Sequence, residues 1–173
     1  MIKKIKQGKE ETKQNKDTEK RTQMFSSGSG NPTFSVILPK GWIDRMDEQV
    51  TEIYKVNENV DTNTEDIVGI MHVSTYGKNS LDPNSKKLSI HSKNFLKSLV
   101  KEYYKLDNIK IKECSKEGSD FSECEFISEN EFWKLMHVRG KHRTAFVTYS
   151  CSEQLKDMEK KDVEIIFDSF RLD

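Results

Sequence analysis

Four segments that favour β-strands follow one another closely in the second half of the chain. They are residues 109–113, 121–127, 132–139 and 142–149. Gly118 and Gly140 lie in two of the connections, where glycine allows the positive φ of a tight turn. Parallel neighbours need a crossover of a dozen or more residues, so connections this short join antiparallel strands. The sequence therefore predicts a four-stranded antiparallel meander.

Three earlier segments also have strand patterns. Residues 34–38 alternate in polarity and end at the turn Pro39-Lys40-Gly41, and residues 51–57 form a second candidate strand. Residues 67–73 are apolar on both faces, which is typical of a central strand covered on two sides. The polar, acidic residues 57–66 between them predict a loop; they lack the central glycine and closing glutamate of an EF-hand.

A first helix is predicted before the meander. Apolar residues recur at three- and four-residue steps from Leu88 to Leu106, which indicates an amphipathic helix. Its start is predicted at Asp82-Pro83, with Ser85 as the alternative cap.

A second helix is predicted after the meander. Ser150 and Glu153 have the spacing of a capping box, which predicts that the closing helix begins there. The side chains expected on its buried side are Leu155, Met158, Val163, Ile166 and Phe170. The expected fold class is α+β, an antiparallel sheet with helices on opposite faces, an α/β/α sandwich.

The first 32 residues differ in composition from the rest. Residues 1–30 carry eight Lys/Arg and four Asp/Glu, and few large apolar side chains, so they cannot bury enough surface to offset the entropy of ordering. Residues 26–32 have the composition of a flexible linker. The expected organisation is a disordered polar and basic tail over residues 1–32 and one α/β domain over residues 33–173.

The charge balance argues against a nucleic-acid-binding protein. The chain carries 29 basic and 29 acidic residues, so by difference residues 31–173 carry 21 basic and 25 acidic ones. Nucleic-acid binding needs clustered Lys and Arg, and the predicted domain is mildly acidic instead.

The cellular location is predicted from the distribution of apolar residues along the chain. No stretch approaches the roughly 20 apolar residues that cross a bilayer, and the charged start Met1–Lys6 is not followed by the apolar stretch of a signal peptide. A soluble, cytoplasmic protein is expected; the alternative is an exported or envelope-tethered protein whose leader is missing from this sequence.

The ends of the predicted domain resemble a known superfamily. Phe34-Ser-Val-Ile-Leu-Pro39-Lys-Gly41-Trp42, and Thr148-Tyr149 before Ser169-Phe170-Arg171, resemble the first strand and the close of the PsbP-like (Mog-type) α/β/α sandwich domains. The resemblance covers about residues 33–173 and rests on packing and turn residues. It implies a non-enzymatic binding module. No metal, cofactor or partner-contact residue of those proteins can be matched here, and a fold alone does not establish a function.

Cysteine and histidine are the candidate catalytic residues. Cys124 or Cys151 as nucleophile, with His137 or His142 as base, is one hypothesis, because hairpins bring their strands side by side. Glu123 and Glu125 flank Cys124 and would raise the pKa of its thiol, which argues against a nucleophile. Free cysteines in strands are commonly small buried hydrophobic residues.

Zinc is the second hypothesis for these residues. Cys114, Cys124, His137 and His142 are the possible ligands, but nine residues separate the two cysteines, whereas structural zinc ligands come in tight pairs. No catalytic, cofactor-binding or metal-ligating residue is therefore assigned from the sequence. Three cysteines without a close pair also do not indicate a disulfide framework.

Two functions remain open at this point. The first is a non-enzymatic protein-interaction or accessory domain with a protein partner, a monomer or weak homo-oligomer that binds no nucleic acid. The alternative is a small-ligand carrier or small enzyme that uses a cleft near His137, His142 and the cysteines. An exposed apolar patch would favour the first, and a pocket with converging polar groups would favour the second.

Overall fold

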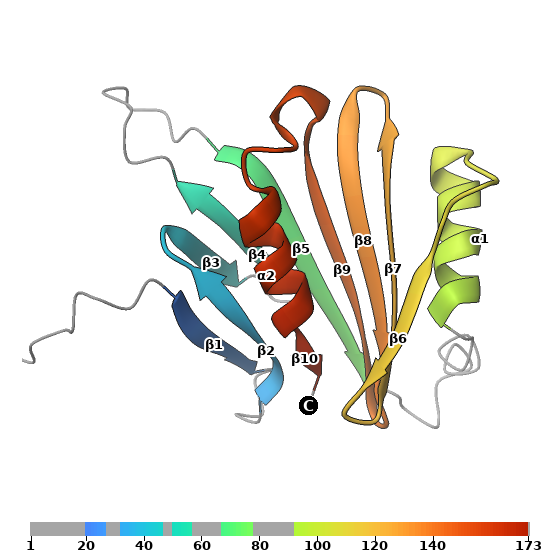
Figure 1. Ribbon diagram of the computed structural model, residues 1–173. Helices are drawn as coiled ribbons and strands as arrows, with labels where there is room; N and C mark the ends of the chain where they lie inside the picture. Colours follow the sequence, from blue (N-terminus) through green and yellow to red (C-terminus); the bar gives the residue numbers. More distant parts are fainter. Residues whose placement is uncertain (1–19, 27–31, 47–49, 57–66, 78–91, 173) are drawn as a thin grey trace, which may run out of the picture.

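Two antiparallel sheets and two α-helices make up the part of the chain that the structure describes (Figure 1). This computed structural model describes residues 20–26, 32–46, 50–56, 67–77 and 92–172. In chain order the elements are β1 (Lys20–Ser26), β2 (Pro32–Pro39), β3 (Trp42–Met46), β4 (Val50–Val56), β5 (Ile67–Gly77), α1 (Ser92–Tyr104), β6 (Lys112–Lys116), β7 (Ser119–Ser128), β8 (Glu131–Arg139), β9 (Arg143–Ser152), the 3-10 helix η2 (Glu153–Leu155), α2 (Lys160–Ser169) and β10 (Arg171–Leu172).

The larger sheet contains the predicted meander. Its strand order is β3-β4-β5-β9-β8-β7-β6, with antiparallel pairing throughout. Glu117 and Gly118 have φ of 52° and 78°, and Glu129 and Asn130 have φ of 54° and 64°. Positive φ at both central residues gives the two-residue turns whose twist matches that of the strands they join. The prediction of four consecutive hairpin-connected strands is confirmed.

The first strand of the meander lies three residues later than predicted. Residues 109–111 are not in β6; Ile109 and Ile111 are half-buried and pack against the cluster under α1. Their apolar side chains mimic a strand pattern, but they contact a helix instead of continuing the sheet.

A smaller sheet with the order β1-β2-β10 corrects the predicted domain boundary. Residues Lys20–Ser26 were assigned to the polar tail but form β1, paired with β2 along its length. Phe25 is buried and its ring stacks on Phe34 at 4.4 Å, while the Thr33 hydroxyl donates to the Phe25 carbonyl at 3.0 Å. One buried ring and a ladder that is regular from Lys20 to Phe25 hold a strand whose other side chains are mostly exposed.

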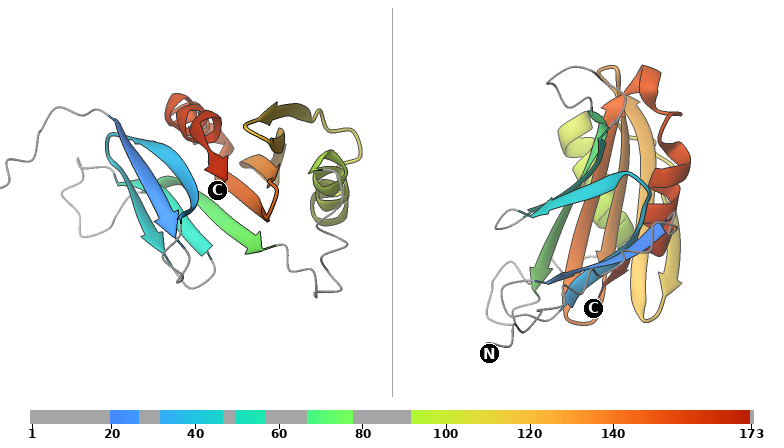
Figure 2. Two further views of the ribbon diagram at one scale, coloured as in Figure 1. Left: turned by 90° about the horizontal axis from the view of Figure 1, so that it is seen from below. Right: turned by 90° about the vertical axis from the view of Figure 1, so that its left-hand side faces the viewer.

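The two α-helices cover opposite faces of the larger sheet, as predicted (Figure 2). Leu96 and Val100 of α1 pack on Cys124 and Leu135. On β8 the next residue, Met136, faces the other way and belongs to the core cluster that includes residues of α2. Successive side chains of a strand point to opposite faces, so β7, β8 and β9 serve two separate clusters.

The closing helix begins later than predicted. Ser150 lies inside β9, which runs to Ser152, and α2 starts only at Lys160. Tyr149 and Cys151 are buried and continue the pairing of β9 with β5 and β8, which prevents a helix from starting at Ser150. Of the expected buried side, Met158 is exposed, Leu155 is half-buried, and Val163, Ile166 and Phe170 are buried.

Strand β5 is interior to the larger sheet, but its two faces differ. Gly69, Met71 and Val73 are buried, whereas Val68 and Ile70 are only half-buried. The expected start of α1 at Asp82-Pro83 or Ser85, the loop 57–66, and residues 1–19 and 27–31 of the expected tail lie outside the described residues. Within the described part of the chain, no helix is both long and apolar enough to span a membrane.

Candidate functional site

The cysteines and histidines singled out from the sequence do not form one site. Cys124 belongs to the cluster under α1, and Cys151 belongs to the core on the opposite face of the sheet. His137 is buried on the α1 side, where its ring stacks on Phe95 at a centroid distance of 4.3 Å. Cys124 and His137 are thus diagonal neighbours on one face, and Cys151 is separated from both by the sheet.

Burial makes Cys124 and His137 poor catalytic groups. Burial, with the charges of Glu123 and Glu125, raises the pKa of the Cys124 thiol to about 12. Burial, with the charge of Arg139, lowers the pKa of His137 to about 4. A nucleophilic cysteine needs an accessible thiolate, so the burial of both groups and the direction of both pKa shifts favour a packing role for this pair. The predicted effect of the two glutamates on the thiol is confirmed.

The residues considered for zinc are likewise dispersed. Cys114 and His142 are exposed, on β6 and in the β8–β9 connection, while Cys124 and His137 are buried. Among the described residues, no three His, Cys, Asp or Glu side chains are placed to share a metal ion.

The α2 side of the sheet contains a buried hydrogen-bonded pair. The Tyr149 hydroxyl donates to Glu159 Oε2 at 2.9 Å, and both side chains are buried. Burial raises the pKa of Glu159, and its second oxygen, Oε1, has no hydrogen-bond partner. A Cβ at Gly69 would overlap the Tyr149 hydroxyl, so the tyrosine fits only because residue 69 has no side chain.

A second polar contact fixes the first turn of α2. Asp162 Oδ2 accepts a hydrogen bond from Trp42 Nε1 at 3.0 Å and from Lys55 Nζ at 3.2 Å. The acidic side chain also lies where the helix dipole favours negative charge. Together with the Tyr149–Glu159 bond, these contacts set the position of α2 against β3, β4 and β9.

Two cavities lie in series between α2 and the first three strands of the meander, β6, β7 and β8. The upper cavity, of about 290 Å³, is bounded by η2–α2 on one side and β7 on the other, with β8 as its floor. Its lining includes Glu125, Ile127, Phe132, Lys134, Lys156, Asp157, Lys160, Val163 and Glu164. The lower cavity, of about 200 Å³, is lined by Cys114, Phe121, Met136, Phe167 and others. Figure 1 shows α2 beside β9, with β8, β7 and β6 extending beyond it. We call the two cavities together the α2 groove.

Lys134 lines the upper cavity and contacts Phe167, which lines the lower one. Its side chain is only 8% exposed, and its Nζ lies 5.0 Å from the centre of the Phe167 ring. A cation over an aromatic face is attracted by the ring quadrupole, and this contact joins β8 to α2 across the groove. The apolar rings of Phe132 and Phe167 are thus on either side of a single buried cation.

The α2 groove does not coincide with the cleft predicted near His137, His142 and the cysteines. Neither His137 nor His142 lines the upper or the lower cavity, and Cys114 is the only one of the three cysteines that does. The sequence feature that points to Lys134 as a groove residue is the alternation of β8, which places Phe132, Lys134 and Met136 on one face of the strand. A lysine between two apolar residues on a buried face is unusual, and this could have been read from the sequence.

Comparisons with known proteins identify the fold. The solution structure of a cyanobacterial PsbP (CyanoP) from Synechocystis sp. PCC 6803 matches with a TM-score of 0.54 and 12% identity, over 88% of this chain and 92% of that one. A crystal structure from Bacteroides thetaiotaomicron matches with a TM-score of 0.48 and 17% identity, over 90% of this chain and 49% of that one. No family model and no curated protein sequence matches the chain. The chain therefore has a PsbP-like fold, as its end motifs indicated.

Proposed function

We propose that this protein is a non-catalytic accessory domain that binds a protein partner in the α2 groove. The observation that carries the proposal is the groove itself, two cavities in series between α2 and β6–β8. Small-molecule sites are usually one concave pocket, whereas an extended segment of a partner contacts successive pockets with successive side chains.

The chemistry of the groove specifies the kind of segment. Phe132 in the upper cavity and Phe121 and Met136 in the lower one offer apolar contacts. Charged side chains of both signs surround them, the pattern of an interface with an apolar centre and a polar rim. The proposed occupant is an extended segment with apolar side chains at its centre and polar residues beside them.

The rim of the upper cavity supplies a residue for testing. Ile127 on β7 lines this cavity and is 42% exposed, so a partner in the groove would cover it. Ile43 on β3 is 39% exposed and lies at the other edge of the larger sheet. The two isoleucines both lie on strands of the larger sheet and have similar exposed fractions, but only Ile127 lines the groove.

The test compares Ile127→Glu with Ile43→Glu. Immobilised wild-type protein and both variants are incubated with native lysate of the source organism, and the captured proteins are quantified by mass spectrometry. A partner captured by the wild type and by Ile43→Glu, and lost by Ile127→Glu, is the expected result, because a buried charge in the interface carries a desolvation cost.

Two results would contradict the proposal. Equal capture by Ile127→Glu would place the contact elsewhere on the molecule. If the wild-type protein captured no partner with saturable binding, the hypothesis of an accessory domain would be refuted.

A further inference from the structure

The cation at the floor of the α2 groove has no acidic partner among the described residues. Lys134 makes no hydrogen bond or ion pair with the described residues; its electrostatic contact among them is the cation–π contact with the Phe167 ring. Glu125 stands directly opposite on β7 but is exposed to solvent and lies beyond salt-bridge distance. Burial of a charge without a counter-charge is unfavourable, so an anion that reaches Lys134 would be stabilised there.

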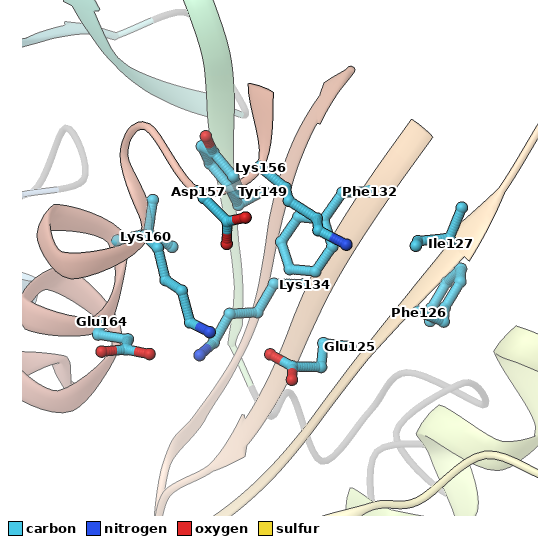
Figure 3. A pocket seen from close by; sticks show the side chains of 11 residues that line it. Glu125, Phe126, Ile127, Phe132, Lys134, Tyr149, Lys156, Asp157, Lys160 and Glu164 are labelled. Atoms are coloured by element: carbon cyan, nitrogen blue, oxygen red, sulfur yellow. The ribbon is translucent and has the colours of Figure 1, made fainter. Parts of the chain in front are cut away.

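A second cation points to the same place from α2. In Figure 3 the side chains of Lys134 and Lys160 extend toward one another across the upper cavity. Lys160 also lacks an ion pair with the described residues, and it is the first residue of α2. Two converging ammonium groups repel each other, and the positive end of the helix dipole adds to the same field. One anion between them would relieve both effects.

The other charges of the cavity limit the kind of anion. Lys156 also lines the cavity and is half-buried. Glu125, Asp157 and Glu164 line it and are exposed at its rim. Their negative charges would repel a doubly charged phosphate more strongly than a singly charged group. Phe132 and Val163 supply an apolar surface in the same cavity, and its volume of about 290 Å³ is at the small end for a ligand site.

We propose that the upper cavity binds a single carboxylate group attached to a small apolar body. The carboxylate lies between Lys134 and Lys160, and the apolar body lies on Phe132 and Val163. The inference rests on the groove being a binding surface, but holds for either source of the carboxylate, a free small acid or the C-terminal residue of a protein partner.

The first experiment uses hexanoate as the probe. Hexanoate is titrated into the ¹⁵N-labelled full chain, with hexanol and inorganic phosphate as comparisons, and amide shifts are followed by NMR. Saturable shifts confined to the residues around Phe132, Lys134 and Val163 are expected with hexanoate, with roughly tenfold weaker binding of hexanol and of phosphate. Equal binding of hexanol would show an apolar pocket without an anion site and would overturn the proposal.

Charge-removing variants test the two lysines. Lys134→Met and Lys160→Met should each weaken hexanoate binding by roughly tenfold, because each removes a charge-assisted hydrogen bond. Lys161→Met, at the exposed next position of α2 outside the cavity, should bind hexanoate as the wild type does. Lys160 is exposed, so its variant retains the fold even if the buried Lys134→Met does not. Unchanged affinity in Lys160→Met and in a folded Lys134→Met would overturn the proposal.

A second pair of probes separates the two sources. A short peptide that ends in leucine is compared with the same peptide carrying a C-terminal amide. Tighter binding of the free-acid peptide than of hexanoate, lost in the amide, assigns the site to a partner's C-terminus; binding of hexanoate but not of the peptide assigns it to a free acid. If neither probe binds, the carboxylate site is refuted, while selective loss of a captured partner by Ile127→Glu would still support the accessory-domain proposal.

Discussion

The two faces of the larger sheet are built from the same strands but differ in chemistry. The face under α1 holds Leu96, Val100, Cys124 and Leu135 with a surrounding shell of aromatic rings. The face under α2 holds the larger apolar core together with the Tyr149–Glu159 pair and the buried Lys134. One face is a packed hydrophobic layer around the neutral imidazole of His137, and the other combines packing with a buried cation and a buried carboxyl beside open cavities.

The comparison shows that residue type alone does not identify a site. Cys124 and His137, two of the residues considered for catalysis, are neutral packing groups on the α1 face. Lys134, a buried cation without an ion pair among the described residues, and Glu159, a buried carboxyl with one unpartnered oxygen, are on the α2 face. His137 Nδ1 on the α1 face also lacks a hydrogen-bond partner among those residues, but its imidazole is neutral. Environment therefore decides which of these side chains can take part in binding.

The largest expected effect tests whether the α1 face is purely structural. Leu96→Ala should lower the free energy of unfolding by about 2–5 kcal/mol, because it removes a fully buried side chain and leaves a cavity. Urea denaturation measures the loss, and Tyr103→Ala, at a 71% exposed position on the same helix, should change stability by less than about 0.5 kcal/mol. Loss of hexanoate binding in a folded Leu96→Ala would contradict the separation of the two faces.

The next effect concerns pH and the α1 face. The pKa of His137 is lowered from 6.5 to about 4, so the unfolded chain binds a proton more readily between these values. Stability should therefore fall as pH drops from 6.5 to about 4, by roughly 3 kcal/mol from this residue. His137→Leu should remove that loss in urea denaturation at several pH values, whereas His142→Asn, at an exposed histidine, should retain it.

A smaller effect is expected from the polar pair on the α2 face. Tyr149→Phe leaves Glu159 buried without its hydrogen-bond donor and should cost about 1–3 kcal/mol at neutral pH. The pKa of Glu159 is raised by burial, so ionisation of this group costs stability as pH rises through the region above 4.5. The penalty of the variant should therefore shrink at acid pH, where Glu159 is protonated. An unchanged penalty across pH would show that lost packing, not the carboxylate, accounts for the cost.

The smallest effect is expected at the rim of the groove. Ile127→Glu and Ile43→Glu replace exposed side chains and should each change the free energy of unfolding by less than about 0.5 kcal/mol. Thermal and urea denaturation of both variants provide the measurement. A large loss for Ile127→Glu alone would mean that this side chain supports the fold, and its capture result would then have to be repeated with a milder substitution.

Local patterns in the sequence were sufficient for most of the fold. Side-chain alternation and short glycine-containing turns determine the meander, and one apolar stripe determines α1. Strand β1 could not be predicted in the same way, because Phe25 is its only buried side chain and its pairing with β2 is a long-range backbone interaction. The Ser150 capping box failed for the same reason, since pairing of β9 overrides a local helix signal.

The candidate site depended only in part on a local pattern. The alternation of β8 places Lys134 on an apolar face, but its burial requires α2, some thirty residues later in the chain, to pack Phe167 against it. Cys124 was the reverse case, because its two neighbouring glutamates are visible in the sequence and correctly indicated an unreactive thiol. Electrostatic effects between adjacent residues could be predicted, and those that require the assembled groove could not.

The small sheet has a consequence for how the molecule reaches its folded state. Strand β2 pairs on one side with β1 and on the other with β10, in which Leu172 faces Phe34. In a nascent chain, one edge of β2 therefore stays unpaired until β10 has left the ribosome. The core residues Ile166, Phe167 and Phe170 emerge at a similarly late stage. Pairings of such long sequence separation slow folding, so joining of β1 and β10 through β2 is expected to be a late step in folding of this domain.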